Sequence, residues 1–93
     1  MDYKAIAEQV GPRVGATQEW IFHVLREGII SGKLPGGMQL KQDEISAALN
    51  VSHIPVREAL RRLEAQGLVR SHANRGAAVT ELTRSELLDV MEV

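Results

Sequence analysis

The stretch AALNVSHIPVREALRRLEAQGL, residues 47–68, decides the fold predicted for this chain. It begins with the end of one helix, and Asn50 is a residue type that takes the left-handed conformation closing such a helix. A second helix is predicted over 52–66. Ser52 is its expected N-cap, and Pro55 falls in its first turn, where the missing N–H is tolerated. The pattern indicates two helices joined by a tight turn.

The predicted second helix has one apolar face and one polar face. Helical spacing brings a set of small and apolar residues to the inner face: Val56, Ala59, Leu60, Leu63 and Gly67. The opposite face carries Ile54, Arg57, Glu58 and Arg61. A solvated helix face is the ordinary interpretation, with Glu58 and Arg62 as an i, i+4 ion pair.

A helix that enters a DNA groove presents side chains near its N-terminus to base edges and phosphates. The first turn offers Ser52, His53, Ile54 and Arg57, with Arg61 one turn further on. An arginine binds guanine O6 and N7 or clamps a phosphate, and a serine at a helix N-terminus donates to a phosphate. These residues are the predicted DNA contacts of the helix.

The residues before this stretch are predicted to support it by packing. Residues 1–14 are predicted to be a flexible lead-in, with a short helical turn at 3–10. A first secure helix is predicted over 17–31, with Thr17 as N-cap and Gly32 ending it. After a Pro-Gly-Gly turn and a short strand, residues 42–49 are predicted to form the first helix of the pair.

The residues after this stretch are predicted to form a hairpin. Two strands are predicted, over 68–72 and 77–80. Between them, the residues Asn74-Arg75-Gly76 are typical of a hairpin turn. A hairpin directly behind a helix-turn-helix is the wing of a winged helix. An arginine on a projecting turn suits the narrow, negative minor groove, so Asn74, Arg75 and Gly76 complete the predicted DNA contacts.

The overall class expected is mostly α with a small β-hairpin wing, a winged helix-turn-helix over 15–82. Residues 83–93 begin with a capping box and continue with an apolar pattern. They are too few to form a stable helix alone. We therefore expect them to start a linker or a C-terminal domain, with the chain being a fragment or docking on another subunit.

Charge is unevenly distributed along the chain. The 93 residues have a formal net charge of −1. Residues 51–76 contain five arginines and two glutamates, a net charge of +3, so the remainder carries −4. Positive charge is concentrated where a nucleic-acid ligand is expected.

Other classes of function have little support in the sequence. Cysteine is absent, which excludes a disulfide framework and a thiolate metal site. The three histidines, His23, His53 and His72, lie in different predicted elements without paired spacing, so no metal site is expected. We expect no cofactor, no enzymatic activity, no membrane span and no signal peptide. The open alternative is a winged-helix module whose arginine surface binds an acidic protein partner.

The chain resembles the winged-helix DNA-binding domain of the GntR family of bacterial transcription regulators. The resemblance covers about residues 17–82 and rests on VS-x-x-PVREALRRLEAQGLV, flanked by ISGKLPGG and NRGAAV. It implies a cytoplasmic, homodimeric regulator, such as a repressor, that binds a pseudo-palindromic DNA operator. It also implies a small-molecule effector, bound by a C-terminal domain. LTRSELLDVMEV resembles the start of the effector domain of the FadR-like (FCD) subfamily.

Carried over by position, the family's DNA contacts fall on Ser52, His53, Ile54, Arg57 and the tip Asn74-Arg75-Gly76. His53 stands where the family usually has arginine, and Ile54 where it often has threonine. A neutral histidine does not make the forked guanine contact of an arginine. The resemblance therefore leaves the operator sequence, the effector and the sign of regulation open.

Overall fold

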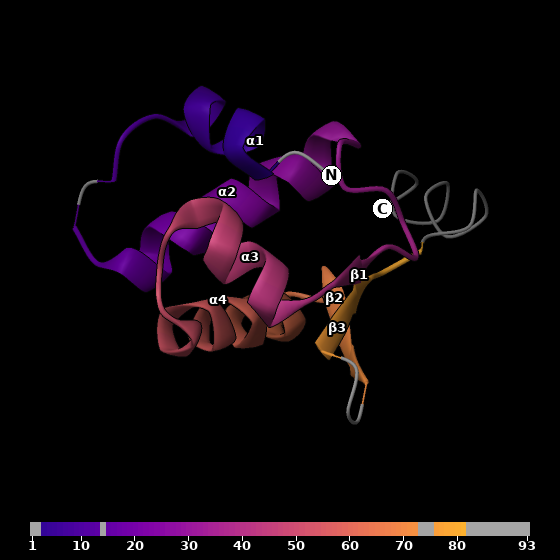
Figure 1. Ribbon diagram of the computed structural model, residues 1–93. Helices are drawn as coiled ribbons and strands as arrows, with labels where there is room; N and C mark the ends of the chain where they lie inside the picture. Colours follow the sequence, from indigo (N-terminus) through magenta and orange to yellow (C-terminus); the bar gives the residue numbers. More distant parts are fainter. Residues whose placement is uncertain (1–2, 14, 73–75, 82–93) are drawn as a thin grey trace.

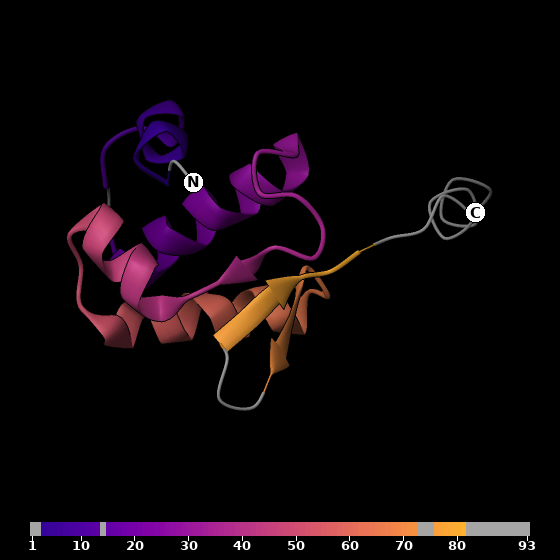
Figure 2. The ribbon, with the colours of Figure 1, turned by 45° about the vertical axis from the view of Figure 1, so that its right-hand side comes forward.

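A computed structural model describes residues 3–13, 15–72 and 76–81 of the chain. The elements in chain order are α1 (Tyr3–Val10), α2 (Thr17–Ser31), β1 (Gln39–Leu40), α3 (Gln42–Leu49), α4 (His53–Ala65), β2 (Val69–His72) and β3 (Gly76–Val79). In Figure 1, α2 crosses the middle of the molecule between α1 and α4. Figure 2 shows the small sheet beside α4. Within the described ranges, no helix is long and apolar enough to cross a membrane.

One hydrophobic core joins the four helices to the sheet. Leu, Ile and Val dominate it, with contributions from the loop before β1 as well. Its fully buried large side chains are Tyr3, Ile6, Ile21, Leu25, Leu34, Leu40, Ile45, Leu63, Val24, Val56 and Val69. Because every described helix and strand contributes to this cluster, the surface elements are held in fixed relative positions.

Residues 3–10 form the short helical segment that the sequence predicted, but they pack into the fold and are not part of a flexible lead-in. They form the two-turn helix α1, which packs on α2 and α3. Tyr3 and Ile6 are one turn apart and are both buried, with exposed fractions of 2% and 1%. The burial of these two side chains stabilises a helix that is too short to persist alone.

The predicted helices at 17–31 and 42–49 are confirmed. Ala16, rather than Thr17, occupies the N-cap position of α2, so the predicted cap was one residue late. Thr17 Oγ1 instead accepts a hydrogen bond of 3.0 Å from Arg13. Gly32 ends α2 in the left-handed conformation, as expected.

The turn between α3 and α4 has the predicted form. Asn50 has a φ of 55°, and its N–H donates to the carbonyl oxygen of Ser46. Val51 is half-buried and packs against the core. Ser52 is the N-cap residue of α4, but its side chain makes no capping hydrogen bond. The tight turn therefore fixes the direction in which α4 leaves α3.

The end of α4 fixes the position of the hairpin. Gly67 has a φ of 78°, its N–H donates to the Glu64 carbonyl, and the Leu68 N–H donates to the Leu63 carbonyl. These two bonds make a Schellman motif. Gly67 takes the C′ position that a glycine favours after a helix, and it lies exposed there rather than on the inner helix face. The motif turns the chain directly into β2.

The predicted hairpin is present, and β1 joins it to complete a three-stranded antiparallel sheet in the order β1-β3-β2. The hairpin register runs from the Val69–Val79 pair to the His72–Gly76 pair. The strands are 69–72 and 76–79, so the first begins one residue later than predicted and the second lies one residue earlier at both ends. Residues 73–75 and the predicted capping box and helix at 83–93 lie outside the described residues.

Candidate nucleic-acid interface

The first turn of α4 presents its side chains to solvent. Ser52, His53 and Ile54 are all exposed, and Ile54 has an exposed fraction of 71%. Ile54 is one of two large apolar side chains that are this open among the described residues. Val56 and Leu63 on the other side of α4 are buried, as the helical spacing predicted. The exposed side of the first turn of α4 is therefore accessible to a partner.

The three arginines of α4 have different surroundings. Arg57 is exposed, and it has no ion pair within the described part of the chain. Arg61 lies 3.8 Å from Glu58 (Nη1 to Oε1), an exposed i, i+3 pair that contributes little energy. The guanidinium carbon of Arg62 lies 4.1 Å from the ring centroid of Phe22 in α2. Arg62 therefore belongs to the packing of α4 on α2, rather than pairing with Glu58.

His53 has a partner that sequence reasoning missed. Its Nε2 atom lies 2.8 Å from Oδ1 of Asp43, in the first turn of α3. The helix dipole favours an acidic residue such as Asp43 in the first turn of α3, but this does not indicate a contact with His53. The turn geometry that brings the starts of α3 and α4 together is set by tertiary packing, so spacing along the chain gave no signal of this contact.

The hairpin is tied to α4 on its β2 side. The backbone N–H of Ser71 donates to Oε2 of Glu64 at 3.0 Å. Arg70, the neighbouring residue of β2, is exposed and adds a positive charge that was not among the predicted contacts. Gly76 has a φ of 78° at the start of β3. Asn74 and Arg75 of the predicted tip lie outside the described residues.

Gly76 also has a packing role. A Cβ atom at this position would lie 3.0 Å from the carbonyl oxygen of Leu40. Glycine therefore permits both the positive φ and the close approach of β3 to the end of β1. The predicted minor-groove role of Gly76 stays a prediction beside this structural one.

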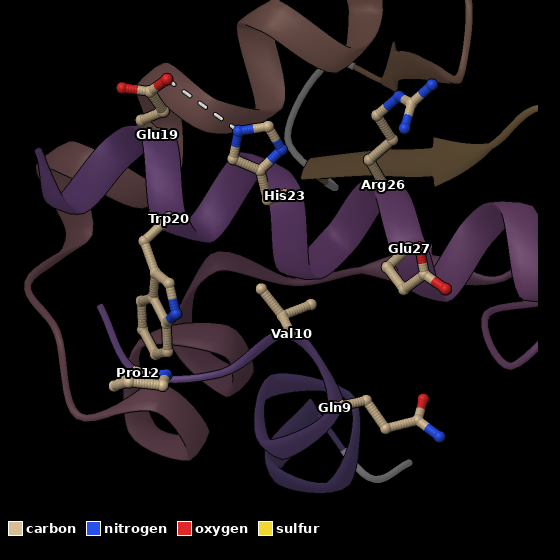
Figure 3. A pocket seen from close by; sticks show the side chains of 8 residues that line it. All are labelled: Gln9, Val10, Pro12, Glu19, Trp20, His23, Arg26 and Glu27. Atoms are coloured by element: carbon tan, nitrogen blue, oxygen red, sulfur yellow. Dashed lines mark ion pairs between the residues drawn. The ribbon is translucent and has the colours of Figure 1, made fainter. Parts of the chain in front are cut away.

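A second surface feature is a groove of about 920 Å³ between α1 and α2. Figure 3 shows Trp20 of α2 pointing toward Pro12, the His23 ring turned toward Glu19, and Val10 and Gln9 on the other wall of the groove. Two polar contacts involve its lining: Trp20 Nε1 donates to the Gly11 carbonyl at 3.0 Å, and His23 Nε2 lies 3.9 Å from Glu19 Oε1.

Two of these side chains have ordinary places in the fold. Trp20 is half-buried against the core, and His23 is exposed on the helix surface. Across the described ranges, no three His, Cys, Asp or Glu side chains gather in a way that holds a metal ion.

The arrangement defines a class of protein. Two helices joined by a tight turn, a second helix with an open polar face, and a hairpin behind it form a winged helix-turn-helix. The family model described as "Bacterial regulatory proteins, gntR family" matches residues 17–79. The chain belongs to this family, whose members are regulatory proteins and not enzymes.

Named relatives support the same class. The chain is 38% identical over 65 residues to the "Probable D-xylose utilization operon transcriptional repressor" of Paenarthrobacter nicotinovorans, covering 70% of this chain and 29% of that protein. It is 30% identical over 82 residues to the "HTH-type transcriptional repressor RspR" of Escherichia coli K12, covering 88% and 36%. These names favour DNA-binding regulation over the alternative of a protein-interaction module.

A solved structure shares the fold. The crystal structure of a GntR-family transcriptional regulator from Pseudomonas syringae pv. tomato DC3000 has a TM-score of 0.70 and 38% identity, covering 98% of this chain and 40% of that one. The chain thus spans well under half the length of these relatives. The comparisons support the family and leave the predicted FadR-like subfamily a prediction.

Proposed function

We propose that this chain is the operator-reading domain of a transcription regulator, with α4 in the major groove of double-stranded DNA. The observation that carries the proposal is the open first turn of α4, where Ser52, His53, Ile54 and Arg57 are all exposed. Arg57 binds a guanine edge or a phosphate, and Arg61 anchors the next turn. The Ser52 hydroxyl is not engaged in capping, which supports a role on a phosphate.

The hairpin reaches the neighbouring minor groove in this proposal. The predicted tip residues, Asn74, Arg75 and Gly76, are proposed as the minor-groove contacts, and the exposed Arg70 on β2 is proposed to contact the backbone phosphates. An arginine that enters a minor groove is favoured by the negative potential of that channel. Glu64 holds β2 against α4, which supports a fixed spacing between the two contacts.

The whole protein is proposed to act as a cytoplasmic homodimer on a pseudo-palindromic operator. A single small module buries too little surface for useful specific affinity, so two copies on two half-sites are expected. The relatives extend well beyond the matched region. That extra length is consistent with a C-terminal domain that binds a small effector and changes DNA affinity.

A titration of this chain with labelled duplex DNA tests the proposal. Arg57→Ala should lower the affinity by about 1–3 kcal/mol and reduce the salt slope by about one, because a cationic contact is lost. Fluorescence anisotropy at several salt concentrations measures both quantities. Arg26→Ala, an exposed arginine on α2, is the matched control. Equal losses for both variants would contradict the placement of α4 in the groove.

A further inference from the structure

The contact between Asp43 and His53 joins the first turns of α3 and α4. At 2.8 Å between Nε2 and Oδ1, two bare acceptors would repel each other. The imidazole therefore carries a proton on Nε2 and is oriented by the carboxylate. The remaining ring nitrogen, Nδ1, is an acceptor whenever the ring is neutral. The two side chains thus act as one polar unit.

This unit is on the surface. The side chain of Asp43 has an exposed fraction of 91%, and that of His53 has 55%. Exposed ion pairs contribute little to stability, so stabilisation of the fold is a weak reason for this contact. The pair lies beside Ile54 and Arg57, so it places a carboxylate on the face that is proposed to contact DNA.

We propose that Asp43 and His53 form a base-reading pair that accepts a hydrogen bond from the N4 amino group of cytosine. The proposal rests on the proposed placement of α4 in the major groove. There, cytosine offers a donor, whereas guanine offers the acceptors O6 and N7. A carboxylate accepts a hydrogen bond from the cytosine amino group and is repelled by the guanine acceptors. Asp43 is then a specificity-determining residue that lies outside the recognition helix.

A different role for an exposed carboxylate at this interface is repulsion of phosphates. Repulsion would weaken binding to all sequences alike, because phosphates carry no sequence information. The contact with His53 favours the base-reading role, since it holds the carboxylate against the turn that reaches the base edges. The two roles predict different effects of removing the charge.

Selection of bound sequences from a random duplex pool, with this chain at about 50 mM salt to favour binding, tests the proposal. The wild-type chain should enrich cytosine at one position of each site. Asp43→Ala should reduce that preference by about tenfold, because the acceptor is lost. Asp43→Asn keeps the shape and should move the preference toward adenine, which an amide recognises through N6 and N7.

Two further variants make the test specific. His53→Arg should change the preferred base at the same position to guanine, because a guanidinium donates to O6 and N7. Glu44→Ala removes an exposed carboxylate from the same turn of α3, one that makes no contact with His53 in the described structure. It should leave the cytosine preference unchanged.

The outcomes separate this proposal from the proposed function. If the pool is enriched but Asp43→Ala keeps the wild-type preference, base reading by Asp43 is wrong while DNA binding by α4 stands. A uniform gain of affinity for every sequence would mean simple phosphate repulsion, which also contradicts it. If the wild-type chain enriches no duplex, both proposals fail.

Discussion

Arg57 and Arg62 lie on the same helix, yet their side chains have different surroundings. Arg57 is open to solvent, whereas Arg62 covers the ring of Phe22. Both residues belong to the apolar-and-arginine pattern of 47–68, and the pattern alone does not separate them. The difference arises because Arg62 projects toward α2, an element distant in the sequence. Sequence reasoning paired Arg62 with Glu58 because it considered one helix at a time.

Arg62→Ala should lower the free energy of unfolding by about 0.5–1 kcal/mol, because an exposed cation–π contact is lost. DNA affinity should change much less than in Arg57→Ala. Chemical denaturation followed by circular dichroism measures the first quantity, and anisotropy measures the second. A large loss of affinity with no loss of stability would show that Arg62 is a DNA contact instead.

Tyr3 is a buried phenol without a hydrogen-bond partner among the described residues. Burial, with a smaller contribution from the charge of Glu44, raises the pKa of Tyr3 to about 12 from its ordinary value of 10.0. The folded state therefore holds this proton more tightly than the unfolded state. Its contribution to stability is complete below pH 10 and is lost as pH rises toward 12.

Tyr3→Phe should leave stability at neutral pH unchanged or higher, because an unpaired buried hydroxyl is removed. Between pH 10 and 12 the variant should lose less stability than the wild type. Urea denaturation at a series of pH values compares the two chains, and other titrating groups affect both equally. Parallel curves through this range would refute the buried, protonated state of Tyr3.

At the scale of elements, the pair α3–α4 and the hairpin followed from the sequence, whereas only the position of α1 did, and its packing into the core did not. Local features of the sequence predict the pair. Asn50 adopts the left-handed conformation of the turn, and Pro55 lies in the first turn of α4. The helix α1 exists through its packing on α2 and α3, and Gly11 and Pro12 after it suggested an irregular segment. The free energy gained by burying Tyr3 and Ile6 compensates for the small number of backbone hydrogen bonds in α1.

Gly28 is where α1 and the loop before β1 approach α2. A Cβ atom here would lie 2.7 Å from Leu34 Cδ1 and 2.9 Å from Ile6 Cδ1. Gly28→Ala should therefore destabilise the chain by about 1–3 kcal/mol through overpacking. Thermal unfolding measures this loss.

Ile6→Val removes Ile6 Cδ1, which is one of the two side-chain ends that the new methyl group would meet, and supplies the control. The double variant should be less destabilised than the sum of the two single variants, because the shortened side chain makes room for the new methyl group. Additive losses would show that α1 does not pack at Gly28 as described.

At the scale of the whole molecule, charge and shape give the chain one candidate DNA-binding side. The chain is slightly acidic overall, and its positive charge is concentrated between residues 51 and 76. Figure 1 places α4 on the side of α2 opposite α1, next to the hairpin. The sequence was enough to predict this side and its candidate residues. It did not predict the Asp43–His53 contact or the exposed Arg70, because both depend on how elements pack.

Interference by methylated bases tests the central claim most directly, namely that α4 reads the major groove. Methylation at guanine N7 blocks the major groove, and methylation at adenine N3 blocks the minor groove. On a selected site, guanine N7 methylation should abolish binding at the positions under α4, and adenine N3 methylation should interfere only beside them, under the hairpin. Full binding to DNA methylated at guanine N7 throughout the site would contradict the placement of α4 in the major groove.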